Sequence, residues 1–135
     1  MRIISGRYRG HKVSTVSGPG YRPAMDKVRQ ALFSMLEARG VDWEQTRVLD
    51  LFAGSGSLGL EALSRGSHLV WFVERSKKAA AALRQTLHRL QVPQEKYRIL
   101  IREAGKVLRQ EPPRTFDLVF VDPPYKMTYQ TQKGS

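Results

Sequence analysis

Three glycines and one glutamate form the pattern in this sequence with the clearest chemical meaning. Gly54, Gly56 and Gly59 stand in DLFAGSGSLG with the spacing G-x-G-x-x-G, directly after an apolar run. Glu74 ends a second apolar run about 20 residues later. Glycine lets the backbone approach a ligand closely, and an acid after a second strand can hold two ribose hydroxyls. The pattern predicts a site for a nucleoside-bearing ligand, although a tight strand-to-helix turn without a ligand would use the same glycines.

Asp50 distinguishes between two nucleoside-bearing cofactors. It precedes the glycines at the end of the first apolar run, so we expect its carboxylate to face the mouth of the pocket. That charge would repel a pyrophosphate and attract the ammonium of a methionine moiety. Asp50 therefore favours S-adenosylmethionine over NAD.

A second unusual stretch, FDLVFVDPPYK, occupies residues 116–126. Its apolar run predicts a buried strand, which must end at Pro123 and Pro124 because proline has no N–H to donate to a sheet ladder. A carboxylate at Asp122 and an aromatic ring at Tyr125 flank the prolines. Taken alone, the stretch is also typical of a strand that ends at proline with a capping acid.

The elements that would hold these residues alternate from residue 47 onward. Apolar runs predict strands over 47–52, 68–74, 97–103 and 116–122, and helical spacing predicts helices over 56–66, 76–92 and 105–111. This alternation is typical of right-handed βαβ units and a parallel sheet covered on both faces. The fold class is therefore α/β and doubly wound, and such sheets bind ligands at the carboxyl ends of their strands.

The first 40 residues differ from this pattern. Two short β-prone runs broken by Gly6 and Gly10 predict a small hairpin, and SGPGYRP predicts a linker. Asp26 is a candidate N-cap for a helix that Gly40 ends. The apolar stripe of this helix comprises Val28, Ala31, Leu32, Met35 and Leu36. We expect residues 1–23 to form a basic hairpin and linker, and residues 24–135 to form the main domain.

Charge and composition narrow the function. The formal net charge is +11, and residues 1–29 hold seven basic side chains against the single acid Asp26. This favours a polyanionic partner such as nucleic acid, although a solvated surface or a non-enzymatic ribosomal neighbour would show the same excess. Cysteine is absent, the three histidines have no metal-ligand spacing, and no window is apolar enough for a membrane span. We expect a cytoplasmic, metal-free protein.

The four motifs together resemble one known family. DLFAGSGSLGLEALSRG followed by VDPPY is the hallmark of amino-methylating Rossmann-like methyltransferases. RIISGRYRGHKV and RPAMDKVRQALFSML are similar to segments of the bacterial 16S ribosomal RNA guanine-N2 methyltransferases. The resemblance implies a Rossmann-like fold, S-adenosylmethionine as cofactor, and small-subunit ribosomal RNA or its ribonucleoprotein particle as partner.

The resemblance also implies roles for individual residues. Asp50, Phe52, Gly54 and Gly56 would frame the methionine end of the cofactor, Glu74 would hold the ribose, Arg75 would lie beside the adenosine, and Glu103 and Ala104 would contact the adenine. Asp122 and the Pro123 carbonyl, fixed by Pro124, would accept hydrogen bonds from the target amine, and Tyr125 would stack on the base. Arg7, Arg9, Lys12, Arg22 and Arg29 are the candidates to hold RNA phosphates.

The sequence departs from the family in one respect, because such sheets normally continue with three more strands after DPPY. We therefore expect a domain that is incomplete at its C-terminus, and self-association through the strand over 116–122. An N6-adenine DNA methyltransferase and a non-catalytic fragment that binds cofactor or RNA remain alternatives. An NAD-linked oxidoreductase does not explain DPPY.

Overall fold

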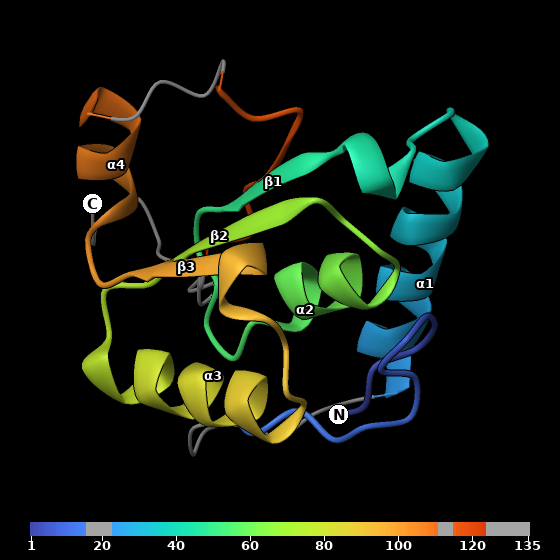
Figure 1. The fold of residues 1–135 in the computed structure, drawn as a ribbon, viewed down its shortest axis with the longest axis horizontal. Helices are drawn as coiled ribbons and strands as arrows, with labels where there is room; N and C mark the ends of the chain where they lie inside the picture. The colour runs from blue at the N-terminus through green and yellow to red at the C-terminus, as the bar shows by residue number, and fades with distance from the viewer. Residues whose placement is uncertain (16–22, 111–114, 124–135) are drawn as a thin grey trace, which may run out of the picture.

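A parallel sheet lies at the centre of the protein, whose computed structural model describes residues 1–15, 23–110 and 115–123. Its strands in this part are β1 (Arg47–Asp50), β2 (Leu69–Val73), β3 (Tyr97–Leu100) and β4 (Leu118–Phe120). They pair in the order β3-β2-β1-β4, all parallel, so their carboxyl ends meet at one edge (Figure 1). Asp50 at the end of β1 lies opposite Phe72 of β2 and Phe120 of β4.

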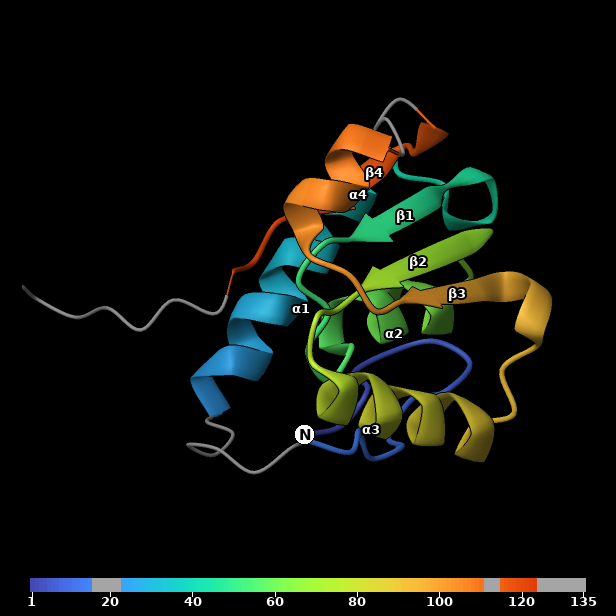
Figure 2. The ribbon, with the colours of Figure 1, turned by 90° about the vertical axis from the view of Figure 1, so that its left-hand side faces the viewer.

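Helices cover both faces of this sheet. They are α1 (Pro23–Ala38), α2 (Ser57–Ser64), α3 (Lys77–Arg89) and α4 (Ala104–Gln110), with short 3₁₀ turns at Trp43–Gln45 and Gln94–Lys96. Figure 2 shows α2 and α3 on one side of the sheet and α4 on the other. The predicted doubly wound α/β fold is confirmed, and each strand and helix predicted after residue 23 exists with bounds that differ by a few residues.

Alternate residues of the strands supply two apolar cores. Val48, Val70 and Phe72 pack in the larger core with Leu83 and Leu87 of α3. Leu49 and Val73, which point to the opposite face, pack in the smaller core under α4. Strands buried on both faces explain why their sequences read as continuous apolar runs rather than as alternating patterns.

Helix α1 differs from the prediction in its start and in its buried face. It begins at Pro23, whose fixed φ suits a first helical turn, so Asp26 lies inside the helix and is not its N-cap. Val28 is 70% exposed and Met35 45%, whereas Phe33 is fully buried. The ring of Phe33 packs against those of Trp43 and Phe120, with centroids 5.4 and 5.7 Å apart. These aromatic contacts orient the helix so that Phe33 faces the core, whereas Val28 and Met35 of the predicted stripe face solvent.

The N-terminal arm, residues 1–15, forms less structure than the predicted hairpin. A single antiparallel bridge joins Arg2 and Lys12, supported by bonds from Ile3 N to His11 O and from Val13 N to Met1 O. No extended strand is assigned in this described segment. The arm is therefore a looped segment, and its position depends on contacts with α2.

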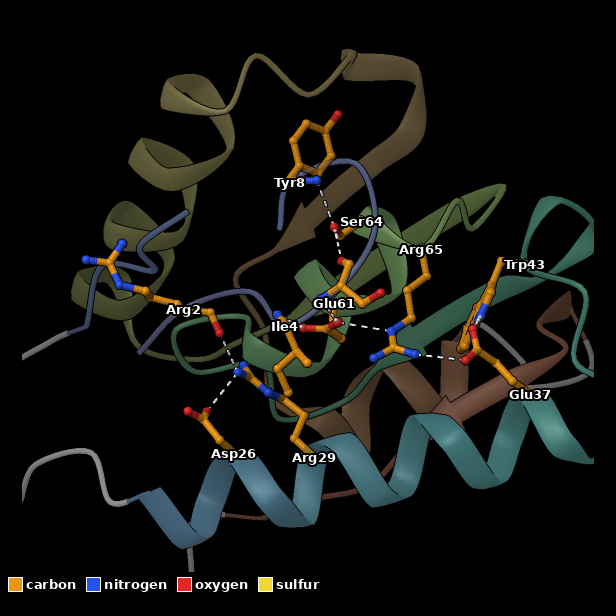
Figure 3. Close-up of polar contacts among 11 residues, drawn as sticks. Arg2, Ile4, Tyr8, Asp26, Arg29, Glu37, Trp43, Glu61, Ser64 and Arg65 are labelled. Carbon is orange, nitrogen blue, oxygen red and sulfur yellow. Dashed lines mark hydrogen bonds and ion pairs between the residues drawn. The ribbon is translucent and has the colours of Figure 1, made fainter. Parts of the chain in front are cut away.

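Glu61 of α2 holds the arm in place, as Figure 3 shows. Its fully buried carboxylate accepts hydrogen bonds from Ile4 N at 2.9 Å and Ser5 N at 3.1 Å, and it pairs with Arg65 Nε at 3.0 Å. One turn later, Ser64 Oγ accepts from Tyr8 N at 2.9 Å and donates to Ser5 O at 2.6 Å. These bonds satisfy polar backbone groups that the docked arm removes from water.

The same arginine extends this network to α1. Arg65 Nη1 pairs with Glu37 Oε1 at 2.9 Å, and Glu37 Oε2 accepts from Trp43 Nε1 at 2.9 Å (Figure 3). The Arg65 guanidinium also lies over the Phe33 ring, 4.9 Å from its centroid. The arm, α1 and α2 are thus fixed relative to one another on one side of the sheet.

The described helices include none with the length and apolarity that a membrane span requires.

Candidate active site

A cleft of about 440 Å³ opens where the carboxyl ends of the strands meet. We call it the strand-end cleft, and six residues singled out in the sequence line it: Phe52, Glu74, Arg75, Glu103, Ala104 and Pro123. They come from the loops after β1, β2, β3 and β4, far apart in the chain. The structure therefore brings most of the predicted cofactor residues to one place, together with the start of the DPPY segment.

Glu74 is fixed by two backbone groups at the edge of this cleft. Its Oε1 accepts a hydrogen bond from Gly54 N at 2.9 Å, and its Oε2 accepts from Ser76 N at 2.8 Å. Each carboxylate oxygen has a second lone pair for another donor. A carboxylate held in this way is pre-oriented to accept bonds from a pair of vicinal hydroxyls.

Asp50 lies deeper than predicted. It is fully buried, its Oδ2 accepts from Gly59 N at 3.1 Å, and its Oδ1 has no hydrogen-bond partner in the described part of the chain. Burial, with smaller contributions from the charges of Asp122 and Glu74, raises the pKa of Asp50 to about 7. The residue does not line the strand-end cleft, so it forms a buried base beside the glycine loop and not a charge at the pocket mouth.

The three motif glycines have different roles. Gly54 has φ +56 and nothing within 4 Å of where a Cβ would stand, so its Cα faces open space. A Cβ on Gly56 would lie 2.4 Å from Leu83 Cδ1, and one on Gly59 would lie 2.3 Å from the Phe72 ring. Only Gly54 leaves room for a ligand, whereas Gly56 and Gly59 allow α2 to pack closely against α3 and β2.

The end of β4 faces two cavities. Pro123 lines the strand-end cleft, while Asp122 lines a second cavity of about 780 Å³ between α1 and β4. This α1–β4 cavity is bounded by Met1, by residues of α1 including Arg29, by Ser57 and Leu58, and by β4 up to Asp122. Pro124 and Tyr125 lie outside the described residues. Asp122 and Pro123 thus stand at the junction of two spaces that a ligand could share.

The predicted RNA contacts divide into three groups. Arg7, Arg9 and Lys12 are exposed on the arm, with the Arg7 guanidinium 5.8 Å from the Tyr8 ring centroid. Arg22 lies outside the described residues. Arg29 is only 5% exposed and pairs with Asp26 at 3.0 Å, so the structure separates it from the exposed candidates of the arm. The reason is the altered buried face of α1, which turns Arg29 inward.

Sequence reasoning missed part of both cavities. Arg102 and Gly105 line the strand-end cleft on either side of the predicted pair, and Ser57 and Leu58 line the α1–β4 cavity. These residues follow strand ends or the glycine loop in the sequence, and that position could have identified them as candidate lining residues. Within residues 1–15, 23–110 and 115–123, no group of three or more acidic or histidine side chains is placed to hold a metal ion.

Comparison with known proteins gives consistent matches over most of the chain. The family model described as Conserved hypothetical protein 95 matches residues 1–133. Ribosomal RNA small subunit methyltransferase D of Haemophilus influenzae is 38% identical over 133 residues, which cover 98% of this chain and 67% of that protein. The structure of a putative methyltransferase from Escherichia coli has 36% identity and a TM-score of 0.77, over 93% of this chain and 65% of that one.

A more distant structure is named for its cofactor. The SAM-dependent methyltransferase from Agrobacterium tumefaciens has 25% identity and a TM-score of 0.61, over 77% of this chain and 33% of that one. This chain spans about two thirds of the length of the two nearer relatives, from Haemophilus influenzae and Escherichia coli.

Proposed function

Because this chain belongs to the family described as Conserved hypothetical protein 95, we propose that it is an S-adenosylmethionine-dependent methyltransferase acting on small-subunit ribosomal RNA. Its target would be the exocyclic N2 amine of a guanine. The observation that carries the proposal is the junction at Asp122 and Pro123, where a nucleoside-sized cleft and a second cavity meet. The relative named ribosomal RNA small subunit methyltransferase D supports the choice of RNA.

The residues present fit S-adenosylmethionine. Glu74 would accept the ribose hydroxyls, and Phe52, Glu103 and Ala104 would surround the adenine in the strand-end cleft. Asp50 Oδ1, which has no hydrogen-bond partner among the described residues, is a buried acceptor that the ammonium of the methionine end would satisfy. The cofactor supplies an electrophilic methyl group on its sulfonium. The similarity to the SAM-dependent methyltransferase of Agrobacterium tumefaciens supports the same cofactor.

The residues at the end of β4 would orient the target amine. An exocyclic amine is a poor nucleophile because its lone pair is delocalised into the base. Hydrogen bonds donated by its two N–H groups to an Asp122 oxygen and to the Pro123 carbonyl would favour a pyramidal nitrogen with its lone pair directed at the methyl group. The N–C bond would form as the C–S bond breaks, the sulfur would keep the electron pair, and the methylated nitrogen would lose its extra proton to the Asp122 carboxylate. This mechanism relies on orientation and on stabilisation of the charge that develops, and it requires no strong base.

The exposed basic residues of the arm suit the RNA. Arg7, Arg9 and Lys12 lie outside the cofactor cleft, so they are free to contact backbone phosphates without competing with the cofactor. A substrate of this kind would place the protein in the cytoplasm with the assembling ribosomal particle. Methyl-transfer assays on naked RNA and on the particle distinguish the two forms of substrate.

The test is methyl transfer from radiolabelled S-adenosylmethionine to unmodified small-subunit particles, naked ribosomal RNA and DNA, followed by mapping of the labelled base. We expect label on N2 of one guanine in the RNA. Asp122→Ala is the matched variant, which should bind the cofactor normally and lower the rate by about 10² to 10³. Label on adenine N6 of DNA, or full activity of Asp122→Ala, would contradict the proposal.

A further inference from the structure

Arg29 is a buried cation whose hydrogen-bonding capacity is only partly used. Its Nη2 donates to Arg2 O at 2.6 Å and to Asp26 Oδ1 at 3.0 Å (Figure 3). Its Nε and Nη1 are buried and have no hydrogen-bond partner in the part of the chain that the structure describes. Unsatisfied buried donors are costly and rare in native proteins, so these two nitrogens, which carry three N–H bonds between them, indicate a missing acceptor.

The cavity that Arg29 lines contains a second set of donors. Ser57 and Leu58, the first two residues of α2, line the same α1–β4 cavity. The helix has Gly56 as its N-cap, with no side-chain cap hydrogen bond. N–H groups in a first helical turn have no intrahelical acceptor and carry the positive end of the helix dipole. A guanidinium and a helix N-terminus facing one space are suited to an oxyanion.

The position of the cavity indicates which oxyanion it takes. Asp122 lines the α1–β4 cavity and the next residue, Pro123, lines the strand-end cleft, so one ligand can occupy both. A cofactor with its adenosine in the cleft would carry its sulfonium past Asp122 and its amino-acid end into the cavity. An RNA phosphate fits less well, because much of the cavity wall is apolar and formed by Met25, Val28 and Leu32.

We propose that Arg29 and the N-terminus of α2 bind the carboxylate of the methionine end of the cofactor. The inference rests on the proposed function and adds to it a binding residue that sequence reasoning assigned to RNA. The amino-acid end is a zwitterion, so its carboxylate would meet Arg29 while its ammonium meets the buried acceptor of Asp50. Each charge of the zwitterion would then face a group of opposite charge. Arg29 would act in binding and orientation, and it takes no part in the bond-forming step.

Two ligands that differ only by the carboxylate test this assignment. Calorimetry of S-adenosylmethionine and of decarboxylated S-adenosylmethionine should show the wild type preferring the carboxylate form by roughly tenfold to hundredfold, the range of a charge-assisted hydrogen bond. Arg29→Met should bring S-adenosylmethionine down to the affinity of the decarboxylated form. Binding of the decarboxylated form should stay near its wild-type value, which also shows that the variant is folded. Arg29→Lys, which keeps the charge without the planar donors, should fall between.

A matched control separates direct contact from loosening of the arm. Ser64→Ala removes the Ser64 bonds to Tyr8 N and Ser5 O without touching the cavity, and it should keep the carboxylate preference. If Ser64→Ala loses the preference as Arg29→Met does, or if Arg29→Met keeps it, the assignment is wrong while the proposed function stands. Inorganic phosphate could instead stabilise the wild type but not Arg29→Met, while both proteins keep the same preference for the carboxylate form of the cofactor. That result would overturn the carboxylate assignment in favour of a phosphate site. A wild type that binds neither cofactor form would contradict the proposed function itself.

Discussion

The carboxylate of Asp50 accepts one hydrogen bond from Gly59 N, at 3.1 Å, and keeps its other oxygen buried without a partner among the described residues. The same helix turn that packs α2 against β2 therefore also orients the acid beside the glycine loop. Burial raises the pKa of Asp50 to about 7, so a small change of environment can change its ionisation near neutral pH.

This ionisation predicts pH-dependent cofactor binding. The ammonium of the methionine end favours ionised Asp50, so binding below pH 7 must release a proton. Affinity should then rise by up to about tenfold per pH unit as the pH increases toward 7. Calorimetry at about pH 6 in two buffers of different ionisation enthalpy measures the proton release. Asp50→Asn should abolish it; release that persists in this variant would assign it to another group.

The free protein should show the opposite trend in stability. The pKa of Asp50 is raised above its value of 3.8 in the unfolded chain, so the folded state binds the proton more tightly. Its contribution to stability is complete below about pH 4 and is lost as the pH rises through 7. Urea titrations of wild type and Asp50→Asn across this range isolate that contribution, because the variant lacks the titrating group. A difference between the two that does not vary with pH would contradict the assignment.

Substitutions at the motif glycines should separate effects on protein stability from effects on cofactor binding. Gly59→Ala should lower the free energy of unfolding by about 1–3 kcal/mol because its methyl group would meet the Phe72 ring. Gly54→Ala has open space but a positive φ, so it should cost about 1–2 kcal/mol and also weaken cofactor binding. Urea unfolding and calorimetry measure the two effects. In double variants, Phe72→Leu should restore part of the stability lost in Gly59→Ala and should not change the stability lost in Gly54→Ala.

These glycines also show how far the sequence determines the site. The spacing of Gly54, Gly56 and Gly59 correctly predicts a strand, a tight loop and a helix, because that spacing is a local property of the chain. It does not reveal that Gly56 and Gly59 face Leu83 and Phe72, since those neighbours come from distant segments. The resemblance to ribosomal RNA methyltransferases is confirmed by the similarity to ribosomal RNA small subunit methyltransferase D of Haemophilus influenzae.

Helix α1 shows the limit of periodicity in another way. Val28 and Met35 satisfy the helical stripe as well as Phe33 does, and the helix pattern alone cannot say which face is buried. The structure buries Phe33 against Trp43 and Phe120, and with it Arg29, which the family resemblance made a candidate phosphate contact. The roles of Pro124, Tyr125 and Arg22 stay predictions because they lie outside the described residues.

The arm predicts salt-dependent RNA binding. Arg7, Arg9 and Lys12 are exposed, and if each neutralises one phosphate, their replacement by Ala should flatten the slope of log K against log salt by about 2–3. Filter binding or fluorescence anisotropy at several salt concentrations measures the slope. Arg29→Met is the matched control, since a buried cation should leave the slope unchanged. An equal effect of both variants would place Arg29 on the RNA after all.

The sheet edge predicts self-association. In the described part of the chain β4 pairs only with β1, and Val121 just beyond it is 63% exposed. An apolar strand edge without a blunting charge tends to pair with another chain. The sedimentation coefficient should therefore rise with protein concentration, and Val121→Lys should reduce that rise. A concentration-independent monomer in the wild type would show that this edge is covered.

The docking of the arm onto α2 has a consequence for the order in which the chain folds. Ile4 and its acceptor Glu61 are 57 residues apart in sequence, and Ser14 bonds Thr86 Oγ1 from 72 residues away. The arm precedes α2 and α3 in the chain, so its backbone groups find these partners only after both helices have been synthesised, and closing such long loops is slow. Arm docking should be a late event, and native-state hydrogen exchange should show the Ile4 and Ser5 amides opening before those of β1 and β2.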